Sequence, residues 1–170
     1  PEHVELKLRT AVLPGTEVIL SGVRTVRNED STATAEVSLT VRGQLRELAV
    51  RHGAWLIGGG MPEVVPGDPK RTYNTAVVID PVGTIVARYR KIHLFDVDIP
   101  GGATLRESDG TAPGGGGLVV AAHGLRLGVT ICYDLRFPEL YRRLWREGGA
   151  DVPLVPAAFT AHTGRAHWHL

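Results

Sequence analysis

The sequence is poor in three features that would point to particular classes of protein: cysteine, charge of one sign and long apolar runs. Its single cysteine, Cys132, excludes an internal disulfide and a metal cluster built on cysteines. A formal net charge of +1 creates no strong field that favours nucleic acid or an anionic membrane. No segment approaches the roughly 18 apolar residues that a membrane-spanning helix needs.

The amino terminus also lacks the basic and apolar regions of a signal peptide, and it lacks an initiator methionine. We therefore expect a cytoplasmic protein whose true beginning lies upstream of Pro1. The composition, 43% hydrophobic and 22% charged over 170 residues, suits one globular domain spanning residues 1–170.

Hydrophobic periodicity predicts a layered α/β domain from residue 41 onward. Residues 1–40 match no clear pattern and are expected to be a loop or an insertion, and residues 92–116 a long loop. The expected elements are a helix from Val41 that ends at Gly53, a strand at 55–57, a loop at 62–71, hairpins at 75–79/84–88 and 118–122/125–131, a helix from Pro138 to Gly148, and a strand at 152–155.

The helix that opens at Pro138 is expected to pack on the sheet through one face. Its apolar residues recur at helical spacing and predict a buried stripe, made of Leu140, Tyr141, Leu144 and Trp145.

Cys132 stands where a β-branched strand ends, a few residues before that helix. Open α/β sheets bind ligands at the carboxyl ends of their strands, and backbone N–H groups after such a turn can face a developing oxyanion. A lone cysteine is more often a small buried hydrophobe. These residues alone leave both interpretations open.

Two blocks of sequence resemble a known family. YRKIHLFD at residues 89–96 and GVTICYDLRFPE at residues 128–139 are similar to the lysine and cysteine signatures of the nitrilase (carbon-nitrogen hydrolase) superfamily, and within it to the omega-amidase branch. The resemblance covers residues 41–170 and implies an α-β-β-α sandwich. It further implies that this copy is incomplete at its N-terminus and C-terminus.

The resemblance implies a Glu–Lys–Cys triad, in which Cys132 forms a thioester with the substrate and Lys91 stabilises the oxyanion with the N–H of Tyr133. A free thiol with a pKa of about 8.5 is only a few per cent ionised at neutral pH, so it needs a base or a nearby cation. Glu2 is the candidate base because it follows a proline, as in the family. Its separation from Lys91 exceeds the family's usual spacing, so an ordinary terminal glutamate remains the alternative.

Three further residues are candidates for the site. Glu107 matches a second glutamate that positions substrate or Lys91, and a plain loop carboxylate is the alternative. Arg136 either pairs with a carboxylate to fix the turn after Cys132 or meets a substrate carboxylate. Phe159 is expected to line the pocket.

The implied activity is cleavage of non-peptide amides with release of ammonia, on short dicarboxylic acid monoamides. Nitrile hydrolysis, N-carbamoyl amide cleavage, deaminated-glutathione amide cleavage and an inactive fragment remain alternatives. No organic cofactor is implied, and the irregular spacing of His162, His167 and His169 gives no metal site. Family members usually form homodimers, so a homodimer is expected.

Overall fold

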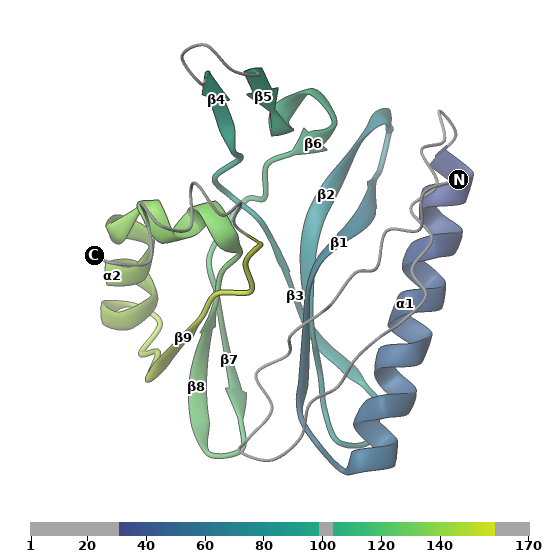
Figure 1. Ribbon diagram of the computed structural model, residues 1–170. Coiled ribbons are helices and arrows are strands. Elements are labelled where there is room, and N and C mark those ends of the chain that lie inside the picture. The colour runs from purple at the N-terminus through teal and green to yellow at the C-terminus, as the bar shows by residue number, and fades with distance from the viewer. Residues whose placement is uncertain (1–30, 99–103, 159–170) are drawn as a thin grey trace.

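The computed structural model describes residues 31–98 and 104–158. Two β-sheets lie face to face, with one helix on the outer side of each (Figure 1). Helix α1 (Ser31–His52) covers the first sheet and helix α2 (Pro138–Arg146) covers the second. The predicted α-β-β-α order of layers is therefore confirmed.

The first sheet is built around a long central strand. Strands β1 (Leu56–Val65), β2 (Asp68–Ile79) and β3 (Ile85–Arg90) pair antiparallel in that order. A short strand, β6 (Thr111–Ala112), pairs parallel with the start of β2. The apolar half of β2 is buried on both faces, because α1 covers one side and the second sheet covers the other.

Helix α1 packs on this sheet through Leu45 and Ala49, which join Val77 and Ile79 in one apolar cluster. The helix ends at His52, which confirms the end predicted at Gly53, and Gly53 has a φ of 57°, the left-handed conformation that often follows a helix. The helix begins at Ser31, so the loop expected over residues 31–40 is wrong.

The loop expected at residues 62–71 is also wrong, because β1 and β2 continue through most of it as a long hairpin. Pro62 lies within β1, which is the outer strand of its sheet. Proline is tolerated there because an edge strand does not need every N–H for pairing. Asp68 and Arg71 form an ion pair of 2.6 Å close to the hairpin's turn.

The second sheet carries the turn that contains Cys132. Strands β7 (Leu118–Ala122) and β8 (Leu125–Val129) form the predicted hairpin, and β9 (Val152–Leu154) pairs parallel with β8. The 3₁₀ helix η2 (Cys132–Arg136) follows β8 and leads into α2. Between the sheets lies a second buried cluster, made of Ala76, Val78, Tyr89, Val129 and Ile131.

The buried stripe predicted for α2 is correct only in part. Leu140 and Leu144 are buried and Tyr141 is half-buried, but Trp145 is 72% exposed. The helix has only nine residues, so its contact with the sheet is one narrow row. Trp145 lies outside that row.

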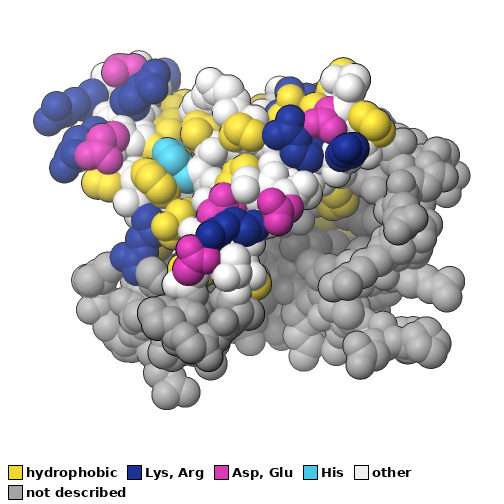
Figure 2. Space-filling model, turned by 90° about the horizontal axis from the view of Figure 1, so that it is seen from above, with side chains coloured by type: hydrophobic (Ala, Val, Ile, Leu, Met, Phe, Trp, Pro, Cys, Tyr) yellow, Lys and Arg dark blue, Asp and Glu magenta, His cyan; other side chains and the backbone are white. Residues whose placement is uncertain are grey.

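The long segment after β3 contains more structure than its sequence predicts. Strands β4 (Asp96–Asp98) and β5 (Thr104–Arg106) pair antiparallel, and η1 (Glu107–Asp109) precedes β6. Arg106 of β5 donates to Asp98 of β4 at 2.8 Å, and Ser108 of η1 donates to Asp96 of β4 at 2.7 Å. Figure 2 looks down on this end of the molecule and shows basic and acidic side chains interspersed with apolar ones.

Candidate functional site

Lys91 directly follows β3 and is buried, with only 3% of its side chain exposed. Its Nζ lies 2.5 Å from Oε2 of Glu107. A buried ammonium is costly without a partner, and the carboxylate of Glu107 supplies one. Lys91 is therefore not a solvated surface lysine.

Glu107 gathers three hydrogen bonds on one half-buried carboxylate. Oε2 accepts from Lys91 and from the N–H of Phe95 at 2.6 Å, and Oε1 accepts from Asn74 at 3.1 Å. Burial by itself raises the pKa of Glu107, but the hydrogen bonds from Lys91, Phe95 and Asn74 outweigh it and hold that pKa below its usual value. Glu107 is therefore an ionised partner of Lys91 and not a plain loop carboxylate.

Asn74 belongs to the same group, and the sequence analysis did not single it out. Its amide donates to Glu107, and its backbone carbonyl accepts from the N–H of Lys91 at 2.8 Å. Asn74 thus holds both members of the ion pair. The one signal in the sequence is an asparagine, a poor strand former, directly before Thr75 and the apolar run Ala76 to Ile79.

Cys132 opens η2 and is partly buried, with its side chain against the cluster between the sheets. Its φ is 48°, in the left-handed region that few residues other than glycine adopt. Its N–H donates to the carbonyl of Pro156 at 3.0 Å, which ties the turn to the segment after β9. The predicted order of strand, cysteine, turn and helix is thus found.

Asp134 joins the segment around Lys91 to the turn that contains Cys132. The residue is fully buried, and Oδ2 accepts from the hydroxyl of Tyr89 at 2.7 Å and from the N–H of Ile131 at 2.9 Å. Oδ1 accepts from His93, through its N–H at 3.1 Å and its ring Nδ1 at 2.8 Å. One carboxylate therefore binds residues on both sides of Lys91 and the residue just before Cys132.

Burial, and then the hydrogen bond to Asp134, raise the pKa of Tyr89 far above its usual value. The phenol therefore stays protonated and keeps donating to Asp134.

An aromatic group packs beside these contacts. The ring of His93 stacks on Phe137 with centroids 3.6 Å apart, and Tyr133 meets Phe137 edge-on at 5.5 Å. Tyr133 also meets Phe95 edge-on at 4.9 Å. Tyr133 thus contacts one ring from each segment, and His93 stacks on the residue after η2. Such pairs add to the stability of a contact.

The expected arginine–carboxylate pair at the turn is wrong within the described part of the chain. The carboxylate that fixes the turn is Asp134, whose partners include no arginine there. Glu139 pairs with Arg142 at 3.1 Å on the exposed face of α2, and Arg136 has no ion pair within residues 31–98 and 104–158. Glu2 and Phe159 lie outside the described residues.

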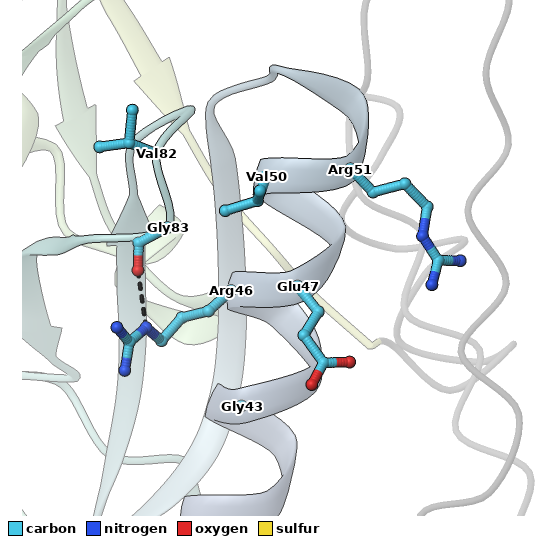
Figure 3. A pocket seen from close by; sticks show the side chains of 7 residues that line it. All are labelled: Gly43, Arg46, Glu47, Val50, Arg51, Val82 and Gly83. Carbon is cyan, nitrogen blue, oxygen red and sulfur yellow. Dashed lines mark hydrogen bonds between the residues drawn. The ribbon is translucent and has the colours of Figure 1, made fainter.

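A surface depression lies on the opposite side of the first sheet from Cys132. It is formed by α1 and the turn between β2 and β3, and Arg46 spans it by donating to the carbonyl of Gly83 at 2.6 Å (Figure 3). Val50 points toward Val82 and Gly83, whereas Arg51 points away. The depression contains no residue of the site, so we do not assign the site's chemistry to it.

The described part of the chain has neither a metal-binding cluster nor a membrane-spanning helix. No three histidine, cysteine, aspartate or glutamate side chains there are grouped as a metal site would require. None of the helices in that part of the chain is long and apolar enough to cross a membrane.

Solved structures with the same fold share the arrangement of these layers. The NitFhit protein of C. elegans superposes with a TM-score of 0.69 at 39% identity, over 82% of this chain and 35% of that one. An amidase from Nesterenkonia sp. AN1, with acrylamide added to its active-site cysteine, gives a TM-score of 0.62 at 27% identity, over 80% of this chain and 48% of that one.

Curated relatives are similar over most of this chain. A deaminated glutathione amidase from Synechocystis is 41% identical over 99% of this chain and 64% of its own length, and the omega-amidase of Homo sapiens is 42% identical over 75% of this chain and 45% of its own. The chain thus spans between about half and two thirds of the length of these relatives. The model of the carbon-nitrogen hydrolase family matches residues 7–170, and the chain therefore belongs to the carbon-nitrogen hydrolase family.

Proposed function

We propose that the complete protein is an amide hydrolase in which Cys132 is the nucleophile and Lys91 stabilises the oxyanion. The observation that supports this most is the network of Asp134, which binds Tyr89 and His93 on either side of Lys91 and Ile131 next to Cys132. The two segments come from different sheets, and this carboxylate holds them against each other.

The reaction proceeds in two steps. The thiolate of Cys132 attacks the amide carbon, and the negative charge that develops on the carbonyl oxygen is met by the ammonium of Lys91 and the N–H of Tyr133. The C–N bond then breaks, ammonia leaves with a proton from the general acid, and a thioester remains. Water hydrolyses the thioester, which releases the carboxylic acid and the free thiol.

Glu107 holds the Lys91 side chain in place in this mechanism. Its carboxylate lies 2.5 Å from Nζ and supplies the partner that a buried ammonium needs. Glu107 is therefore a positioning residue that acts through Lys91. The base that takes the thiol proton is assigned to Glu2, by the resemblance of its Pro-Glu context to the family's own segment.

Short dicarboxylic acid monoamides are the proposed substrates, as the resemblance to the omega-amidase branch implies. Arg136 is proposed to meet the substrate's free carboxylate, since the described residues provide it with no carboxylate partner. Phe159 is proposed to line the pocket. A deaminated glutathione amide is the second candidate, because a relative of that name matches almost the whole chain.

The proposal also covers the cellular compartment and the oligomeric state. The thiol of Cys132 must stay reduced to act as a nucleophile, which favours a reducing compartment such as the cytoplasm. A homodimer is proposed from the resemblance, and light scattering on the complete protein measures its mass directly.

The test is covalent trapping in the complete protein. A slowly hydrolysed amide should add one acyl group to Cys132, located by mass spectrometry of the digested protein, and Cys132→Ala should show no adduct and no ammonia release. An adduct on another residue, or full activity of Cys132→Ala, contradicts the mechanism. Ammonia release from a panel of dicarboxylic monoamides, deaminated glutathione, N-carbamoyl amides and nitriles ranks the substrates, and no release from any of them favours an inactive chain.

A further inference from the structure

We propose that Asp134 is a positioning residue that sets the placement of Lys91 relative to Cys132. This inference rests on the proposed function. It adds to the Glu–Lys–Cys triad and Glu107 a further side chain that contacts no substrate and acts through the two segments it joins.

The first step concerns where the two segments come from. Tyr89 and His93 flank Lys91 at the end of the first sheet, whereas Ile131 and Cys132 lie at the end of β8 in the second. No strand pairing joins the two sheets in the described residues. Apolar packing between sheets is non-directional, so it leaves room for the sheets to slide by a fraction of an ångström.

Directional contacts at Asp134 remove that freedom. The Tyr89 hydroxyl and the Ile131 N–H donate to the same oxygen, Oδ2, at 2.7 and 2.9 Å. One atom therefore accepts a hydrogen bond from the segment of each sheet. Oδ1 is shared by two donors of His93. An ionised carboxylate accepts about four hydrogen bonds, and Asp134 receives four.

The surroundings of the residue fit this role. Asp134 is fully buried and forms no ion pair with lysine or arginine within the described ranges, so its partners there are the Tyr89 hydroxyl, the Ile131 N–H and His93. Hydrogen bonds to an ionised acceptor are about twice as strong as neutral ones. An aspartate therefore holds the junction more rigidly than a neutral side chain of the same size.

His93 is fixed from two sides by the same junction. Its Nδ1 faces Asp134 at 2.8 Å and its ring stacks on Phe137, which follows η2. His93, two residues after Lys91, is thus fastened both to the middle of η2 and to the residue that follows it.

Asp134→Asn in the complete protein tests the proposal with little change in shape. Whichever way the amide is placed, its NH2 group faces the backbone N–H of either Ile131 or His93, and one hydrogen bond becomes a repulsive contact. A displacement of the order of 1 Å can lower turnover by about 100-fold. We expect kcat to fall by between about 10- and 100-fold with KM changed by less than about threefold.

Glu139→Gln is the matched control, because it removes one carboxylate just beyond η2 that is 74% exposed. It should leave kcat and KM as in the unsubstituted protein. Tyr89→Phe is the milder second variant, since it removes only the hydroxyl that reaches Asp134 from the first sheet. It should lower kcat by about three- to tenfold with the melting temperature close to that of the unsubstituted protein.

The outcomes separate a positioning role from a structural one and from failure of the proposed function. An unchanged kcat in folded Asp134→Asn, or in folded Tyr89→Phe if Asp134→Asn does not fold, overturns the positioning role. A loss of kcat that the variants' folded fraction fully explains overturns it as well. Absence of an acyl adduct on Cys132 in the unsubstituted protein contradicts the proposed function instead.

Discussion

Lys91 and Glu107 form a buried ion pair with Nζ and Oε2 2.5 Å apart, although 16 positions separate them in the chain. The pair closes the segment that contains β4 and β5, because its two members lie at the two ends of that segment. The same contact therefore links the side chain of Lys91 to the folding of the long segment between β3 and η1.

Glu107→Gln should lower the free energy of unfolding by about 3 kcal/mol, because it leaves the buried ammonium of Lys91 without a charged partner. Urea unfolding at neutral pH measures the change. Glu47→Gln, on the exposed side of α1, is the control and should stay within about 0.5 kcal/mol of the unsubstituted protein. An equal effect of both substitutions would show that the ion pair adds nothing to stability.

Stability should fall on acidification through the range where glutamates protonate. The pKa of Glu107 is lowered in the folded protein, and so is that of Glu63, where hydrogen bonds from Arg90 and Thr75 outweigh burial, which alone raises it. Carboxylates with lowered pKa stabilise the fold above their unfolded pKa of about 4.3 and lose that contribution as the pH falls toward the folded pKa.

Urea midpoints measured from about pH 6 down to about pH 3.5 test this dependence. The Glu107→Gln variant should lose less stability over that range than the unsubstituted protein, because one of the titrating groups is gone. Parallel curves for the two proteins would assign the acid sensitivity to other carboxylates.

Gly114→Ala should destabilise the protein and displace Lys91, because a Cβ at this position would lie 2.1 Å from the carbonyl oxygen of Arg90. The N–H of Gly114 also donates to the carbonyl of Lys91 at 2.8 Å. We expect the free energy of unfolding to fall by about 1–3 kcal/mol, the typical cost of forcing atoms into such a contact. Gly115→Ala, with no atom within 4 Å of the added methyl, is the control for both unfolding and activity.

Leu144→Ala and Trp145→Ala should differ sharply although the two residues are adjacent. Leu144 is 6% exposed and Trp145 is 72% exposed. The first change should cost about 2–5 kcal/mol through the cavity it leaves, and the second about 0.5 kcal/mol or less. Thermal or urea unfolding ranks them, and a larger loss from Trp145→Ala would show that another surface covers it.

The hairpins and the helix after Cys132 could be predicted because their signals are local. Alternation of apolar residues and a turn such as residues 80–83 act over a few positions, and the structure confirms them. The hairpin of β1 and β2 was missed because Pro62 and charged residues are typical of loops. Its position at the edge of the sheet, which makes proline acceptable, is a property of the assembled fold.

The same difference between local signals and long-range contacts applies to the site. Lys91 and Cys132 could be singled out from motifs, but the contacts that bring their segments together depend on residues distant in sequence. Asn74 and Glu107 are 33 positions apart, and Tyr89 and Asp134 are 45 apart. No periodicity encodes such pairs, and a buried aspartate is indistinguishable in sequence from a solvated one.

Cys132 has a positive φ, a backbone conformation that is unfavourable for the side chain that the proposed chemistry requires. For a side chain with a Cβ, this backbone costs roughly 1–2 kcal/mol, and glycine or asparagine would adopt it with less strain. A descendant of this chain with no use for a thiol would gain stability by exchanging Cys132 for either of them.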